Sequence, residues 1–203
     1  YAVLHERIGG ERALDVLPPI VHGIADDGWG RPTACVDWDV RDVLNHTIGG
    51  MRIFAAELGG RQAAADHESD WLGDEPIKAF DGAVAADVAA WHGPLFPEQL
   101  VNISLGRLPL GLAAVIHLTE LVAHGVDLAC ATGQEHLLDE ELSAGLLEVM
   151  HAMGGVDDYR LPGVFGSVVA AHPDAAPHEQ LAAYLGRDLS GLTYTHHLGD
   201  TAP

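Results

Sequence analysis

Four side chains able to bind a metal ion stand three or four positions apart on one segment of the chain: His117, Glu120, His124 and Asp127. On an α-helix, which turns about 100° per residue, they fall within an arc of about 80° on one face. The rest of the segment is apolar, and a helix that is apolar almost all round is normally buried. A solvated stripe would also carry cations, yet no lysine or arginine occurs between Arg107 and Arg160. The pattern therefore favours a shared interior site.

Glu120 and His124 are four residues apart, so on a helix their side chains lie one above the other and one divalent ion can contact both. Two protein ligands bind an ion weakly, and a third has to come from another helix. His46, in the sequence VLNHTIGG, is the best candidate, because Gly49 and Gly50 one turn later permit a close approach. The predicted site is His46, Glu120 and His124, with positions left open for water or substrate.

Two other residues of the stripe are assigned supporting roles. His117 is predicted to line the pocket and, on its position alone, to act as a catalytic proton shuttle, because the pKa of a free imidazole is close to neutral. Asp127 is predicted to lie outside the ligand set, where it accepts a hydrogen bond from an imidazole N–H.

Each of these patterns also has an explanation without a metal. A single histidine beside an apolar face, such as His46, is commonly a hydrogen-bonded structural residue. A glutamate and a histidine four residues apart occur on ordinary helix surfaces. The whole stripe could also be a polar network within a helical core. The residues alone leave these interpretations open.

Helical periodicity runs through nearly the whole chain, so the elements that would position these residues are helices. Helices are predicted at residues 10–25, 39–58, 77–91, 111–131, 139–153 and 177–186. Pro18-Pro19 predicts a kink or break in the first helix. Asp37 or Asp39 is predicted to cap the second, which ends at Gly59-Gly60. Residues 61–75 are predicted to form a polar surface loop, and only short pieces such as 99–105 and 164–169 could be extended.

These elements predict an all-α fold. We expect an up-and-down bundle of four long helices with additional short C-terminal helices, forming a single domain over residues 1–190. Residues 191–203, which include His196 and His197, are predicted to be a loose tail.

The composition narrows the classes of partner. Ten lysine and arginine residues against thirty acidic residues give a net charge of −20, which repels phosphate backbones and anionic lipid headgroups. We therefore expect no nucleic-acid and no membrane partner. A hydrophobic content of 48% can fill a core. Cys35 and Cys130 form no CxxC motif, no run of eighteen apolar residues occurs, and no signal peptide is visible, so a cytoplasmic location is expected.

Three stretches carry a resemblance to a known family: PTACVDWDVRDVLNHTIGG at 32–50, IHLTELVAHGVDLACATGQ at 116–134 and HEQLAAYLGRD at 178–188. They resemble the DinB/YfiT-like metalloenzymes, in the branch similar to the N-terminal domain of mycothiol-dependent maleylpyruvate isomerase. The resemblance implies a four-helix bundle that holds a divalent ion, usually zinc, with nickel as an alternative. The implied ligands are again His46, Glu120 and His124.

The same resemblance implies a function. A low-molecular-weight thiol, mycothiol or a similar molecule, would add as thiolate to an electrophilic carbon, giving S-transfer or, after bond rotation and loss of the thiol, cis–trans isomerisation. One departure is that the family's frequent His-Gly-Trp-Asp reads His-Gly-Val-Asp here, with Val126, which alters either the pocket or the core packing. Arg52, Arg107 and Arg160 are the candidates for recognising an anionic substrate, on charge alone.

Three other functional classes stay open. The chain could be a non-catalytic metal-binding or stress-response module, a metal-dependent hydrolase that uses water in place of a thiol, or a bundle with a polar core network. The expected partners are a small electrophile and a thiol, with pairing into a homodimer as a general expectation for such bundles. An alanine-rich composition with nine arginines and one lysine fits an actinobacterial source.

Overall fold

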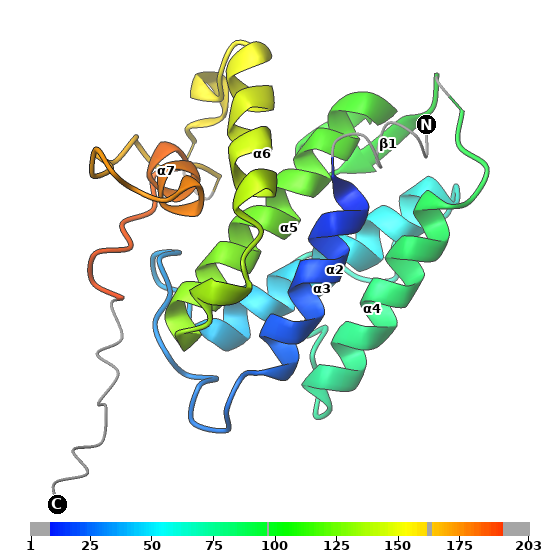
Figure 1. Cartoon of the computed structure of the whole chain (residues 1–203). Coiled ribbons are helices and arrows are strands. Elements are labelled where there is room, and N and C mark those ends of the chain that lie inside the picture. The colour runs from blue at the N-terminus through cyan, green and yellow to red at the C-terminus, as the bar shows by residue number, and fades with distance from the viewer. Residues whose placement is uncertain (1–8, 97, 162–163, 193–203) are drawn as a thin grey trace, which may run out of the picture.

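The computed structural model describes residues 9–96, 98–161 and 164–192 (Figure 1). The described part is mostly helical, as predicted, and also contains a small two-stranded sheet. The α-helices are α2 (Gly10–His22), α3 (Val40–Leu58), α4 (Pro76–Trp91), α5 (Leu110–Thr132), α6 (Glu140–Ala152) and α7 (Pro177–Tyr184). The strands are β1 (Leu100–Ile103) and β2 (Gly106–Pro109), and two short 3₁₀ helices cover Glu135–Leu137 and Asp157–Tyr159. The predicted tail beyond residue 192 lies outside the described residues.

The start of α3, which carries His46, is set by a capping box. The Asp39 side chain accepts a hydrogen bond from the backbone N–H of Asp42, and the Asp42 side chain accepts one from the backbone N–H of Asp39. Asp37 instead adopts a left-handed backbone conformation, with φ of 67°. Of the two predicted caps, Asp39 is therefore the one used. In α2, by contrast, both prolines lie inside the helix, so the chain does not break there.

The helix α5 lies at the centre of the described structure, where it contacts α2, α3, α6, α7 and the two strands (Figure 1). The helix α4 packs mainly against α3 and α2. By length and composition α5 could cross a membrane, but 78% of its most apolar window is buried within the protein, as in a core helix. An up-and-down four-helix bundle stays a prediction.

The two strands form an antiparallel hairpin in which Leu100 pairs with Pro109 and Ile103 with Gly106. The extended character predicted for 99–105 is thus confirmed for part of that segment. The second strand was not predicted, because GRLP is short and alternates weakly. The segment 164–169 is not a strand, although Val169 N–H donates to Ala183 O beside the end of α7.

The segment 61–75 has no helix or strand and is mostly exposed, as predicted for a surface loop, but residues 67–72 pack against α3. The Asn45 side chain accepts hydrogen bonds from the backbone N–H groups of Trp71 and Leu72, and it donates to the backbone oxygen of Ser69. Leu72 is buried in the main core. The segment therefore covers the part of α3 that carries His46.

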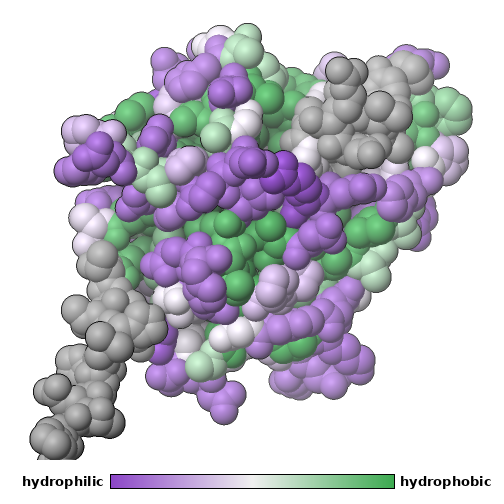
Figure 2. All heavy atoms as spheres, viewed as in Figure 1, coloured by the Kyte–Doolittle hydropathy of each residue, from purple (hydrophilic) through white to green (hydrophobic). Residues whose placement is uncertain are grey.

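The surface reflects the acidic composition. On the face shown in Figure 2, bands of hydrophilic side chains frame the apolar surface that remains visible between them. Among the aspartates, glutamates, lysines and arginines that the structure describes, only Asp87, Asp127 and Arg187 are buried, so the polar stripe of α5 is an unusual feature of the interior.

We predict that Gly49→Ala destabilises the protein, because a methyl group there would lie 2.8 Å from Trp71 Nε1 and 3.0 Å from His67 Cδ2. The expected cost is about 1–3 kcal/mol in the free energy of unfolding, measured by chemical denaturation. The matched control is Gly145→Ala in α6, where nothing lies within 4 Å and the helix should gain about 0.5–1 kcal/mol. Equal stability of the two variants would contradict the close packing of the 61–75 segment on α3.

Candidate metal centre

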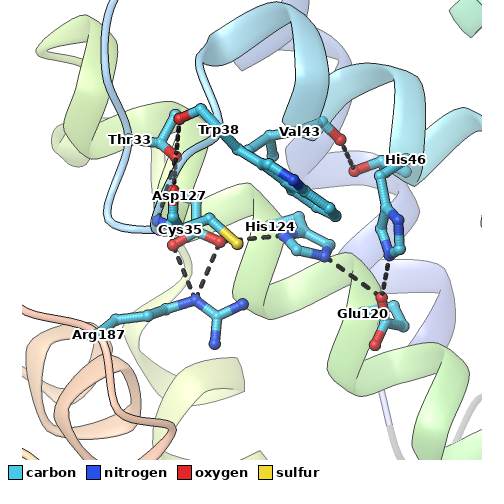
Figure 3. Close-up of polar contacts among 10 residues, drawn as sticks. Thr33, Cys35, Trp38, Val43, His46, Glu120, His124, Asp127 and Arg187 are labelled. Atoms are coloured by element: carbon cyan, nitrogen blue, oxygen red, sulfur yellow. Dashed lines mark hydrogen bonds and ion pairs between the residues drawn. The ribbon is translucent and has the colours of Figure 1, made fainter. Parts of the chain in front are cut away.

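His46 from α3 and the pair Glu120 and His124 from α5 come together in one cluster (Figure 3). Their ligand atoms all lie within 4.8 Å of one another. His46 Nε2 lies 3.1 Å from Glu120 Oε2, and His124 Nε2 lies 3.3 Å from the same oxygen. The three residues predicted from spacing are therefore assembled as expected, while ligation itself stays a prediction.

Asp127 lies directly behind His124. Its Oδ2 is 3.0 Å from His124 Nδ1, the ring nitrogen that faces away from Glu120. Arg187 Nε donates to both carboxylate oxygens of Asp127, at 2.9 and 3.0 Å. Asp127 thereby fixes the ring of His124 so that Nε2 faces Glu120, which is the placement expected of a residue outside the ligand set.

Hydrogen bonds and opposite charges within the cluster favour the charged forms of Glu120 and His124. Burial alone would raise the pKa of Glu120, but hydrogen bonds from His124 and His46 hold it well below its usual value. Burial would lower the pKa of His124, yet the Asp127 and Glu120 carboxylates raise it to about 9. Without a metal, His124 is therefore protonated at neutral pH and donates to a carboxylate from each ring nitrogen.

Two aromatic side chains that sequence reasoning missed hold His46. The Trp38 ring lies 4.7 Å from the His46 ring and 6.1 Å from the His124 ring, between centroids. The His67 ring stacks on His46 at 3.9 Å, and its Nε2 lies 3.1 Å from the His46 backbone oxygen. Burial and the neighbouring His46 lower the pKa of His67. Both residues come from segments outside the helices, where periodicity offers no signal.

A cavity of about 560 Å³ opens beside the trio. Cys35 lines it, together with apolar side chains from α3, α5, the hairpin turn and the segment before α7. Cys35 is a free thiol, and burial raises its pKa to about 11. The thiol is therefore protonated at neutral pH and is not itself a ready nucleophile.

Arg187 is the cation that sequence reasoning did not select. It lines the cavity, is 8% exposed, and directs the far end of its guanidinium away from Asp127 (Figure 3). The preceding Gly186 has φ of +86°, and a Cβ there would lie 2.5 Å from the Gly166 backbone, so only glycine fits this approach. The YLGRD sequence, already part of a stretch that carried the resemblance, was the available signal.

The arginines named from charge alone have other surroundings. Arg160 does line the cavity, but it donates to Asp157 Oδ1 and to the backbone oxygens of Gly166 and Tyr184. Arg52 and Arg107 are not among the residues that line it.

The placement of His117 in the pocket was wrong. His117 is buried and is not among the residues that line the cavity, because its Nε2 lies 2.7 Å from Asp87 Oδ2 on α4. Helical projection places His117 on the same face of α5 as Glu120. His117 lies one turn before Glu120, however, and at that level of the helix Asp87 of α4 is its partner. Within the described part of the chain, His117 pairs with Asp87 and packs beside the rings of Phe54 and Trp91.

The change from tryptophan to valine at 126 affects core packing. Val126 is buried in a small cluster with Cys130 and Ala182, and it does not line the cavity. Of the two explanations left open for this departure, the structure supports the one that concerns the contact between α5 and α7.

The donor set could hold a divalent ion. Two imidazole nitrogens and one carboxylate oxygen are ligands typical of zinc, and three protein ligands leave positions open, as in catalytic sites. The adjoining cavity provides room for further molecules at those positions.

Known proteins are similar to this chain over most of its length. The family described as "Mycothiol maleylpyruvate isomerase N-terminal domain" matches residues 11–129, which include all three residues of the trio. Two uncharacterized proteins of Mycobacterium tuberculosis, from strains CDC 1551 / Oshkosh and ATCC 25618 / H37Rv, are each 31% identical over 178 residues. Each alignment covers 87% of this chain and 94% of the relative. No solved structure matches the chain significantly.

We predict that affinity for zinc rises with pH until about pH 9, because the ion has to displace the proton from His124 Nε2. The expected rise is about tenfold per pH unit for one proton released, measured by chelator competition at pH 6.5, 7.5 and 8.5. The free energy of unfolding of the metal-free protein should instead fall as pH rises. The raised folded-state pKa of His124 contributes stability that is complete below the ordinary imidazole pKa of about 6.5 and is lost as pH rises through about 9. An affinity independent of pH over this range would contradict the assignment of His124.

Proposed function

Because the chain belongs to the mycothiol maleylpyruvate isomerase N-terminal domain family, we propose that it is a metal-dependent enzyme that uses a small thiol as S-transferase or isomerase. The metal would be zinc, with nickel as the alternative, bound by His46, Glu120 and His124. The observation that carries the proposal is the cluster of these three residues at the wall of a cavity of about 560 Å³.

The surrounding residues would keep the ligands in place. Asp127 holds His124 through Nδ1, so that Nε2 is presented to the ion. Trp38 and His67 pack against the ring of His46 and restrict its rotation. Such support favours one geometry of the site over alternatives.

A divalent ion at this position would lower the pKa of a coordinating thiol and so supply a thiolate at neutral pH. Cys35 is protonated under these conditions, which favours a thiol from solution. In the proposed reaction the thiolate forms a C–S bond to an electrophilic carbon. In S-transfer it either displaces a leaving group such as chloride, or adds to a C=C bond whose π bond breaks and whose neighbouring carbon then takes up a proton. In isomerisation the π electrons move onto the activating group of the substrate, the former double bond rotates, and loss of the thiolate restores the double bond.

The cavity favours an enzyme over a non-catalytic metal-binding or stress-response module, because sequestration needs no room for a second molecule. A hydrolase would use the same trio without a thiol, and it is distinguished by the assay below. The proposal also includes a four-helix bundle, a cytoplasmic location and small-molecule substrates in place of nucleic acid, given the charge of −20.

We predict about one equivalent of zinc or nickel per chain in untagged protein, measured by elemental analysis after dialysis. The double variant His46→Ala/His124→Ala should lose most of it, because the one remaining ligand binds weakly. The control is His136→Ala, an exposed histidine outside the site, which should keep the full equivalent. Metal content near zero in the parent protein would favour the polar core network instead.

We also predict that the protein catalyses conjugation of mycothiol to an electrophile such as monochlorobimane. The rate is measured from the fluorescence of the conjugate. Chelator should abolish the rate above background, and added zinc should restore it, because the thiol would be activated only at the loaded site. Conjugation that is absent, or that is insensitive to chelator, would overturn the thiol-dependent proposal. Chelator-sensitive ester hydrolysis without any thiol would instead indicate the hydrolase.

A further inference from the structure

A segment late in the chain, residues 164–187, forms part of the wall of the cavity beside the trio. Residues 164–167 and 185–187 line the cavity, and α7 lies between them. The family match ends at residue 129, so this segment lies outside it. Part of the candidate site is therefore built by a region of the chain that the family match does not cover.

Apolar packing holds the 164–187 segment on α5. Leu181 and Leu185 are buried in the main core, and Ala182 packs in a smaller cluster with Val126 and Cys130 of α5. Burial of these side chains favours the docked position of α7.

Backbone hydrogen bonds then fix the end of α7, from which the side chain of Arg187 starts. The N–H of Val169 donates to Ala183 O at 2.9 Å, which ties the first part of the segment to the last. The N–H of Arg187 donates to Ala182 O at 2.9 Å. The position of Arg187 therefore depends on the docking of the whole 164–187 segment.

A continuous series of contacts leads from Arg187 to the trio (Figure 3). Arg187 Nε donates to Asp127 Oδ2 at 3.0 Å, and the same oxygen lies 3.0 Å from His124 Nδ1. On the other side of its ring, His124 Nε2 lies 3.3 Å from Glu120 Oε2. One carboxylate oxygen thus contacts both the arginine and the histidine of the candidate site.

The carboxylate of Asp127 needs its arginine partner because it is completely buried. Among the lysines and arginines that the structure describes, Arg187 is the one that contacts it. Removing one partner of a buried ion pair leaves the other charge uncompensated. Without Arg187, Asp127 would gain free energy by turning toward water, and His124 would lose the contact that sets the orientation of its ring.

We propose that Arg187 is a positioning residue of the metal centre: through Asp127 it sets the orientation of His124, and it thereby couples metal binding to the docking of the 164–187 segment on α5. Because such coupling is reciprocal, a bound ion also stabilises the docked segment. The inference rests on the proposed function only in taking His46, Glu120 and His124 as the metal ligands.

The first test leaves the sequence unchanged. Hydrogen exchange of the backbone amides of Val169 and Arg187 is measured by NMR on the full chain, with and without one equivalent of zinc. We expect zinc to slow both amides about fivefold or more, as for a typical coupling between two sites. The control amides are those of His92 and Gly93 at the end of α4, which do not line the cavity and should change less than about twofold. Equal slowing of all four amides, or unchanged exchange at Val169 and Arg187, would contradict the coupling.

Two variants separate the hydrogen bond of Arg187 from its bulk. Arg187→Met keeps a side chain of similar length without a donor, whereas Arg187→Gln places an amide N–H where Nε now lies. Zinc affinity, from chelator competition at pH 7.5, should fall about 10–100-fold in Arg187→Met, and Arg187→Gln should bind zinc at least about threefold more tightly than Arg187→Met. The visible absorption of bound Co²⁺, which reports ligand geometry, should change in Arg187→Met and return toward that of the parent in Arg187→Gln.

The control for a general loss of stability is Phe80→Leu. Phe80 is buried in α4 and does not line the cavity, so this variant loses core packing away from the proposed series of contacts. It should keep the zinc affinity and the Co²⁺ spectrum of the parent. An equal loss of affinity in Phe80→Leu and Arg187→Met, or no recovery in Arg187→Gln, would overturn the positioning role.

These outcomes are distinguishable from a failure of the proposed function. Zinc binding that is equal in the parent and in both Arg187 variants would overturn the inference and leave the metal-dependent enzyme standing. The expected differences in zinc binding, found without any thiol conjugation, would do the reverse. A parent chain that binds no metal would overturn both.

Discussion

The packing around α5 depends on one constraint: this helix is nearly buried, yet it carries four ionisable side chains on one face. Buried polar groups are costly unless they are paired, so each group of the α5 stripe needs a partner. His117 meets Asp87 from α4, Glu120 meets His46 from α3, and Asp127 meets Arg187 beyond α7. His124 bridges Glu120 and Asp127 on its own helix. The stripe therefore ties three other parts of the chain to α5, and the cluster of His46, Glu120 and His124 is one section of that network.

The part of the site that could be predicted from the sequence is the part governed by helix geometry. Spacing four residues apart placed Glu120 and His124 together, and the glycines after His46 marked a close approach. Trp71 and His67 of the 61–75 segment make that close approach. The sequence analysis instead predicts that another helix packs closely at these glycines. His117 shows the limit of projection, because a helical wheel gives a face without saying which neighbour covers each turn of it.

The residues that complete the cavity could not be found in this way. Trp38, His67 and Arg187 lie in turns or after a short helix, and they reach the site only through tertiary packing. Composition gives no signal either, because a net charge of −20 does not indicate that one arginine is buried beside the trio. The network explains that arginine: Asp127 holds its Nε and thereby positions the rest of the guanidinium at the cavity wall.

We propose that a divalent ion binds among His46, Glu120 and His124. Anomalous diffraction at the zinc absorption edge, from crystals of untagged protein grown without added metal, tests it most directly. We expect one strong peak about 2.0–2.2 Å from Nε2 of both histidines and from a Glu120 carboxylate oxygen. A peak elsewhere in the protein, or clear density for the direct His46–Glu120–His124 contacts with no peak, would contradict it.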